Sequence, residues 1–288
     1  MPNTQLDDPV VAAPRSFIAR HPVAVLLTVG IAFVWITQMG SLLAGVDVMP
    51  AKIAELAVLL AGATWICHLI GGRSEIRRLY AGLTRWRLGW RYPMLIMAMP
   101  LLTLAVAVAT RTLHAPTGGW GSVMLTYLLL LILGAATGNL WEEMVWGGFI
   151  QGRLMAARGL LVGSLLTAVP FSLMHLPLAF EVNGWKGTTW HDAIVDWGLI
   201  LLAAPFLRCL IGTLLVDTGG STLAAGLMHA SFNAAGAMVV IPGGWQSIPA
   251  LIILTLAVTA YRARRGLSMT DGYAPRLVPA QPGPAATP

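Results

Sequence analysis

The chain has 288 residues, of which 57% are hydrophobic and only 10% are charged. Soluble domains average about 45–50% apolar and about 25% charged residues, so this chain has too few charges to cover a soluble fold of its size. The composition excludes most soluble classes and predicts an all-α, multi-span membrane bundle. The net charge of +6 does not indicate a nucleic-acid partner, because basic residues gather on the cytoplasmic flanks of membrane spans.

A membrane-spanning helix needs about 20 mostly apolar residues. Eight windows of the chain meet this requirement, although the last is short and the fifth contains Pro170 and Pro177. The charged segment 141–158 predicts an amphipathic or partly inserted helix that continues from the fourth span. The eight predicted spans are 22–43, 51–70, 93–114, 122–140, 160–180, 194–216, 221–241 and 248–262.

The arginines predict the orientation, because cytoplasmic loops of membrane proteins are enriched in basic residues. With the N-terminus inside, the inside segments hold all but four of the 18 basic residues. The sequence therefore predicts an integral multi-pass protein of the cell membrane with both termini in the cytoplasm. The inside residues are Arg15, Arg20, Arg73, Arg77, Arg78, Arg85, Arg87, Arg91, Arg153, Arg158, Arg262, Arg264, Arg265 and Arg276.

The chain predicts a single transmembrane domain over 21–265, with its polar motifs between 139 and 236. The segments 1–20 and 266–288 are predicted to be disordered tails, since the first lacks a long apolar run and the second is rich in Pro and Ala. The lipid bilayer is the expected surrounding of the domain.

Three short segments carry polar side chains where apolar ones are expected. An ionisable group at the middle of a membrane costs at least about 2.5–3.5 kcal/mol on insertion scales, so each one needs a reason. Glu142 and Glu143 directly follow the fourth span, His175 lies deep in the fifth, and His229 lies with Asn233 in the seventh.

Helical spacing predicts how these groups face. Phe171 and His175 are four residues apart and share a helix face, as do His229 and Asn233. Neighbouring Glu142 and Glu143 lie about 100° apart around a helix, so one can face a site while the other braces it. If the segments converge, a carboxylate, two imidazoles and a carboxamide share one cavity, which is the composition of a hydrolytic site.

Each residue also has a structural interpretation. A histidine or asparagine in a membrane helix often makes an interhelical hydrogen bond, and a glutamate pair at the end of a span is usually an interface feature. The three segments in this order favour the functional interpretation.

The three segments together resemble the CAAX protease and bacteriocin-processing (CPBP, or Abi) family of intramembrane metalloproteases. Members carry E-E-x-x-x-R, then F-x-x-x-H, then H-x-x-x-[N/D], on separate helices of an eight-span bundle. The resemblance covers roughly residues 122–241 and implies an endopeptidase whose substrate is a membrane-associated or C-terminal peptide segment.

The resemblance implies a role for each matching residue. Glu142 and His175 match the pair that activates water, and His229 with Asn233 matches the pair that polarises the scissile carbonyl and stabilises the oxyanion. Glu143 matches a supporting glutamate. Glu142, His175 and His229 could together hold Zn²⁺ or another divalent metal, although they lack the H-E-x-x-H spacing of soluble zinc proteases. A metal-free mechanism uses the same groups. The position of Glu142 near the predicted inner boundary favours substrate access from the cytoplasm.

One position departs from the family pattern. The motif arginine falls at residue 147, which is glycine, and Arg153 is about 240° further around a helix. A non-catalytic family member, acting as a scaffold, immunity factor or partner protein, is therefore the alternative to an active endopeptidase. A transporter with a buried proton relay is a third class, but the chain lacks the paired broken spans typical of repeat-built transporters.

Overall fold

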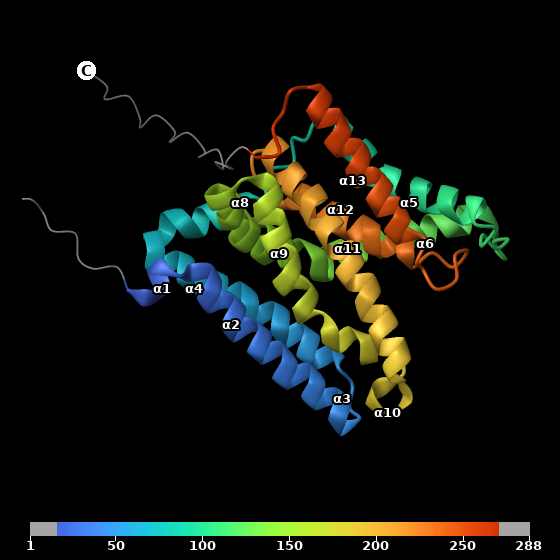
Figure 1. Cartoon of the computed structure of the whole chain (residues 1–288), viewed down its shortest axis with the longest axis horizontal. Helices are drawn as coiled ribbons and strands as arrows, with labels where there is room; N and C mark the ends of the chain where they lie inside the picture. The colour runs from blue at the N-terminus through green and yellow to red at the C-terminus, as the bar shows by residue number, and fades with distance from the viewer. Residues whose placement is uncertain (1–15, 271–288) are drawn as a thin grey trace, which may run out of the picture.

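The computed structural model describes residues 16–270, which contain helices and turns and no strand (Figure 1). The all-α, multi-span prediction is therefore confirmed. Residues 1–15 and 271–288, which make up most of both predicted tails, lie outside the described residues. The described end of the N-terminal segment forms the short helix α1, Phe17–Arg20, where Ser16 Oγ accepts a hydrogen bond from the amide of Ala19. The other helices are α2 (Pro22–Val34), η1 (Trp35–Met39), α3 (Gly40–Ala44), α4 (Met49–Ala81), α5 (Arg91–Ala109), α6 (Gly119–Gly134), η2 (Ala135–Asn139), α7 (Leu140–Glu143), η3 (Met144–Gln151), α8 (Gly152–Arg158), α9 (Leu160–Met174), η4 (Leu176–Phe180), α10 (Gly184–Gly187), α11 (Trp190–Asp217), α12 (Thr222–Gly236) and α13 (Ser247–Arg264).

Seven helices, rather than the predicted eight, are long and apolar enough to cross a membrane within the described part of the chain. The difference lies in α12, which covers only 15 residues of the predicted span 221–241. The chain leaves the helix after Gly236 and turns through Gly243 and Gly244, both of which have positive φ. The apolar residues 237–241 therefore belong to a turn and not to a span.

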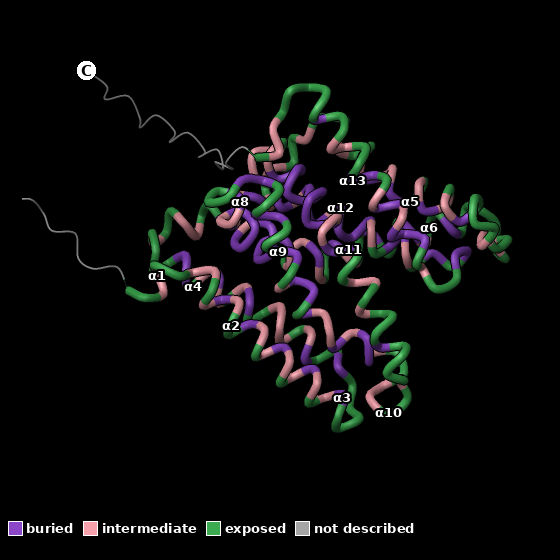
Figure 2. The backbone as a smooth tube through the Cα atoms, viewed as in Figure 1, coloured by how far each residue is buried: buried purple, intermediate pink, exposed green. Residues whose placement is uncertain are grey.

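The helices divide into a buried centre and an exposed periphery (Figure 2). In the apolar stretch of α11, 61% of the residues are buried, but in that of the outer span Pro22–Ala44 only 22% are. Large apolar side chains such as Ile36, Leu101 and Ile132 are more than half exposed on the outer helices. An exposed apolar surface of this kind is what a lipid-facing helix presents.

Hydrogen bonds join loops that are predicted to lie on the same side of the membrane. At the end of the bundle formed by 71–91, 153–161 and 261–269, called the arginine-rich end, bonds join Arg91 to Tyr261, Arg153 to Glu75 and Leu161 to Met269. At the arginine-poor end, formed by 45–52, 110–118, 181–190 and 237–247, bonds join Lys52 to Glu181, Gln246 to Thr112 and His114 to Val240. The helices thus alternate between two ends as the arginine pattern predicts.

One helical rod carries the predicted glutamates. Helices α6 to α8 run without a break from Gly119 to Arg158, so the segment 141–158 does continue from the fourth span. Trp146, Phe149 and Ile150 are buried in it, which places the segment inside the protein. The π-helical turns η2 and η3 stand on both sides of α7, and such turns are frequent at functional sites.

Candidate active site

A cavity of about 810 Å³ opens between α4, the α6–α8 rod, α9, α11 and α12. Four of the predicted site residues line it: Glu142, His175, His229 and Asn233. Its lining reaches Lys52 and Trp245 at the arginine-poor end and, among the described residues, includes none from the arginine-rich end. The cavity therefore opens toward the arginine-poor end of the bundle.

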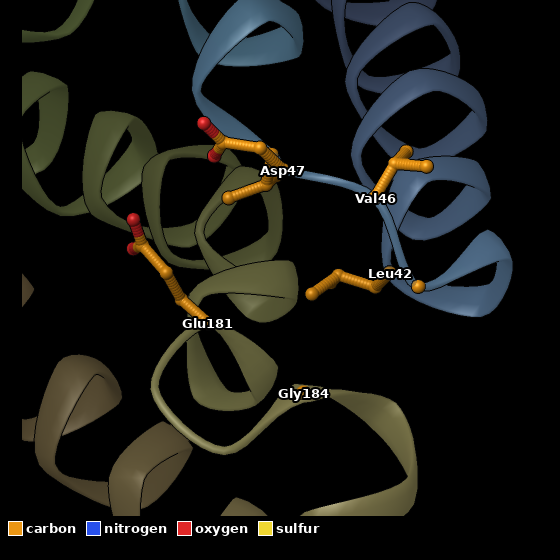
Figure 3. A pocket seen from close by; sticks show the side chains of 7 residues that line it. Leu42, Val46, Asp47, Glu181 and Gly184 are labelled. Carbon is orange, nitrogen blue, oxygen red and sulfur yellow. The ribbon is translucent and has the colours of Figure 1, made fainter.

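A smaller pocket of about 360 Å³ lies at the arginine-poor end, between the α3–α4 loop and the segment that precedes α10 (Figure 3). Both of its carboxylates already have partners. Asp47 accepts a hydrogen bond from the amide of Met49 at the start of α4, and Glu181 bonds Lys52.

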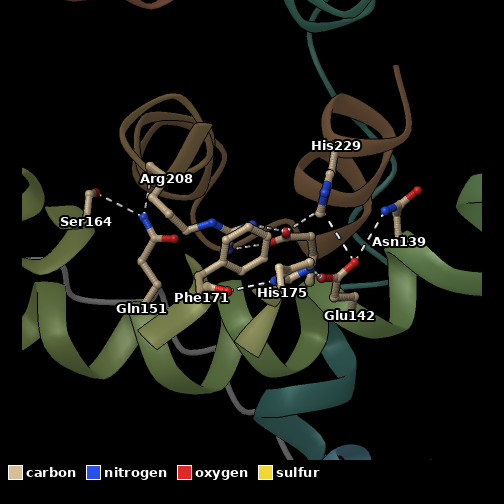
Figure 4. A network of polar contacts seen from close by, with 9 residues as sticks. Asn139, Glu142, Gln151, Ser164, Phe171, His175, Arg208 and His229 are labelled. Carbon is tan, nitrogen blue, oxygen red and sulfur yellow. Dashed lines mark hydrogen bonds and ion pairs between the residues drawn. The ribbon is translucent and has the colours of Figure 1, made fainter. Parts of the chain in front are cut away.

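Glu142 is one of two carboxylates that line the cavity, with Glu55 of α4, and it lies within a network of polar contacts (Figure 4). Its Oε1 atom lies 3.5 Å from Nε2 of His175, and its Oε2 atom lies 3.7 Å from Nδ1 of His229. Asn139, one helical turn earlier, donates from Nδ2 to Oε2 over 3.3 Å. Two segments distant in sequence, the end of α9 and the middle of α12, therefore converge on this one carboxylate.

His175 lies at the C-terminal end of α9, and a hydrogen bond to this helix fixes its side chain. It follows the last residue of α9, and its Nδ1 lies 2.6 Å from the carbonyl oxygen of Phe171. The two rings are 4.2 Å apart between centroids, so they stack as their spacing predicts. Because a carbonyl oxygen only accepts, Nδ1 carries a proton, and in the neutral ring Nε2 presents a lone pair toward Glu142.

Glu143 points away from the cavity and is completely buried. Its Oε2 accepts from Nη1 of Arg208 over 3.1 Å, and its Oε1 accepts from Nη2 of the same residue. Oε1 also accepts from Nδ1 of His229 over 2.8 Å. The guanidinium carbon of Arg208 lies 4.3 Å from the ring centre of Phe171 (Figure 4). Glu143 therefore braces His229 while Glu142 faces the cavity.

The side chain of Asn233 is less constrained than those of the other site residues. It lines the cavity one helical turn after His229, and its side chain makes no hydrogen bond to any residue within 16–270. Its carboxamide is thus free to donate to a group that occupies the cavity.

The predicted metal ligands do not converge as a set. Among the described residues, no group of three or more His, Cys, Asp or Glu side chains is placed to hold a metal ion. Glu142 and His175 are close enough for two ligands of one ion, while Nδ1 of His229 is bonded to Glu143, which leaves only Nε2 of that ring for a metal. The described residues thus place two donors close together, fewer than the three or four protein ligands of a tetrahedral Zn²⁺ site.

The sequence patterns missed two residues of the site. Asn139 could have been found, because it lies three residues before Glu142 on the same helix face. Arg208 was visible only as a charge inside the sixth span, with nothing in its spacing to connect it with Glu143. Arg153 is engaged elsewhere, with Glu75 at 3.3 Å and over the ring of Phe149.

A multi-span helical bundle with a carboxylate and two imidazoles around an internal cavity is the arrangement expected of a membrane-embedded hydrolase. Residues 124–235 match the family described as type II CAAX prenyl endopeptidase Rce1-like. The match runs from α6 to α12, covers all five predicted site residues and confirms the resemblance to CAAX proteases. It indicates, in general terms, a membrane protease of the CAAX endopeptidase type. A comparison with curated proteins gives no match.

Proposed function

We propose that the chain is an intramembrane endopeptidase in which Glu142 and His175 activate a water molecule for attack on a peptide bond. The observation that carries the proposal is the 3.5 Å approach of Glu142 Oε1 to His175 Nε2 at the cavity wall. With the His175 proton on Nδ1, both facing atoms are hydrogen-bond acceptors. A water that bridges the two atoms from the cavity side donates to both, which orients its lone pair toward a substrate carbonyl.

The remaining groups serve the rest of the reaction. Glu142 takes the proton of the attacking water and later returns it to the leaving amine, so one carboxylate acts as base and then as acid. Asn233 and His229 face the developing oxyanion from α12. The bond from Nδ1 of His229 to Glu143 fixes the orientation of this ring beside the cavity.

The substrate in this proposal is a membrane-associated or C-terminal peptide segment. It reaches the site from the end of the bundle at which Lys52 and Trp245 line the cavity. We place the protein in the cell membrane with both termini in the cytoplasm, as the arginine pattern predicts. This orientation puts the arginine-poor end, and therefore the cavity, on the outer side.

The direct test is proteolysis of a peptide library by the purified protein in detergent. His175→Asn keeps a hydrogen-bonding side chain but removes the Nε2 lone pair, so we expect cleavage to fall by about 10²–10⁴-fold, the range of general acid–base contributions. His191→Asn is the matched control, because His191 is an exposed histidine at the start of α11. Equal cleavage by the wild type, His175→Asn and His191→Asn proteins would contradict the proposal.

The mechanism is proposed to be metal-independent, because three ligands do not converge in the site. We therefore expect EDTA and 1,10-phenanthroline to leave the cleavage rate unchanged after prolonged incubation. A loss of activity that added Zn²⁺ restores would contradict this expectation and return Glu142, His175 and His229 to the role of ligands.

The alternative is a non-catalytic scaffold, immunity factor or partner protein, and Gly147 is the residue that favours it. Complementation separates the two functions: a Glu142→Gln chain that fully restores the phenotype of a deletion strain would establish the non-catalytic role.

A further inference from the structure

Arg208 and Gly147 are distant in sequence but meet at one carboxylate. Arg208 projects from α11, and its two terminal nitrogens bond the two oxygens of Glu143. Both side chains of this ion pair are fully buried. A Cβ atom added to Gly147 would lie 2.8 Å from Oε2 of Glu143, the oxygen that Nη1 of Arg208 bonds.

An arginine at position 147 and an arginine at position 208 would both place a guanidinium beside Glu143. Residues four apart share a helix face, so an arginine at position 147 would begin on the side where Glu143 lies. In this chain the Glu143 carboxylate fills that space, and Leu215 and Ile211 stand 3.4 and 3.8 Å from the same Cβ position. Glycine at position 147 leaves room for the carboxylate of Glu143, which Arg208 of α11 holds.

Arg208 contacts Glu143 and Phe171, the two residues that hydrogen-bond to the histidines of the site. Glu143, which it pairs, accepts the hydrogen bond from His229. Phe171, whose ring centre is 4.3 Å from the guanidinium carbon, lies against the ring of His175, and its carbonyl oxygen accepts the hydrogen bond from Nδ1 of that histidine. Arg208 does not itself line the cavity, so it acts through these neighbours and not on the substrate.

We propose that Arg208 is a positioning residue that takes the place of the arginine missing at position 147, and that the guanidinium can be moved from α11 to position 147 when a small residue stands at position 208. The inference rests on the proposed endopeptidase function. It assigns to α11 a role that the family pattern gives to the glutamate-bearing helix, and it removes the reason that Gly147 gives for a non-catalytic protein.

The test is an exchange of the two positions in the full chain, with cleavage of a peptide identified in the library. Arg208→Ala is expected to lower kcat by about 10–100-fold with a smaller effect on KM, the range found when a carboxylate partner that orients a functional histidine is disturbed. Gly147→Arg alone is expected to lose activity as well, because its Cβ meets a carboxylate that Arg208 holds in place. The double variant, Gly147→Arg with Arg208→Ala, is expected to regain most of the wild-type kcat.

Rescue separates positioning from a purely structural contribution. Arg262→Ala removes another buried arginine, the partner of Asp217, and is the matched control. Arg262→Ala is expected to lower the unfolding temperature, and adding Gly147→Arg to this variant is expected to leave the unfolding temperature low. A folded double variant that is no more active than Arg208→Ala would overturn the proposal.

Two further measurements keep the inference testable. If Arg208→Ala does not fold, Arg208→Lys keeps the charge without the two-pronged geometry and is expected to lose about tenfold in kcat; an unchanged kcat would refute the positioning role. If the wild-type protein cleaves nothing, the proposed function fails, and the exchange is then judged by the unfolding temperature. An unfolding temperature of the double variant no higher than that of either single variant would overturn it.

Discussion

Glu142→Gln is expected to lower kcat by about 10²–10⁴-fold, the range of general acid–base contributions, while the protein keeps its fold. Glutamine has the same shape and can still accept the hydrogen bond from Asn139, but it cannot take a proton from water. The side chain is partly exposed to the cavity, so the substitution buries no new unpaired charge. The measurement is kcat and KM on the library-derived peptide, together with the unfolding temperature in detergent.

Glu75→Gln is the matched control for this substitution. Glu75 is a partly buried glutamate of α4 that pairs with Arg78 and Arg153 at the arginine-rich end, away from the cavity. We expect a kcat close to that of the wild type. A Glu142→Gln protein with the activity of the Glu75→Gln protein would exclude Glu142 as the base.

The second large effect is on stability and concerns the other glutamate. Glu143→Gln leaves the guanidinium of Arg208 fully buried without a countercharge, and breaking a buried ion pair in this way costs about 3–5 kcal/mol. Thermal unfolding should show a marked decrease in the transition temperature. Replacing both partners, Glu143→Leu with Arg208→Leu, should be less damaging than the single change, because no unpaired charge stays behind.

Asp217→Asn calibrates this result. Asp217 forms an ion pair with Arg262, but its side chain is 29% exposed, so solvent can compensate for part of the lost interaction. We expect a smaller decrease in transition temperature than for Glu143→Gln. Equal decreases would mean that the Glu143–Arg208 pair has no special energetic role in the centre of the bundle.

Much of the fold could be predicted because a membrane helix is recognisable by its length and composition. The spans 160–180 and 194–216 agree closely with α9 plus η4 and with α11. The error lay at 221–241, where residues 237–241 are apolar but a chain reversal at Gly243 and Gly244 follows a helix that ends at Gly236. Hydropathy does not distinguish an apolar turn buried in protein from an apolar turn of helix in lipid.

The site was predictable where it depends on local spacing. Phe171 and His175 stack because they are four residues apart, and the two adjacent glutamates diverge because helical neighbours must. The contact between Glu143 and Arg208 depends instead on how α11 packs against the α6–α8 rod. Sequence spacing says nothing about two positions 65 residues apart on different helices.

Helix α12 is only about 22 Å long at 1.5 Å per residue, shorter than the hydrocarbon core of a bilayer, which is about 30 Å thick. It packs against α5, α6, α7 and α11, so its ends meet protein and need not reach the headgroups. Hydrophobic mismatch acts on the outer helices, which respond by tilting. The position of the helix that bears His229 and Asn233 therefore depends on its protein neighbours and not on bilayer thickness, so we expect the geometry of the candidate site to persist in membranes of different lipid composition.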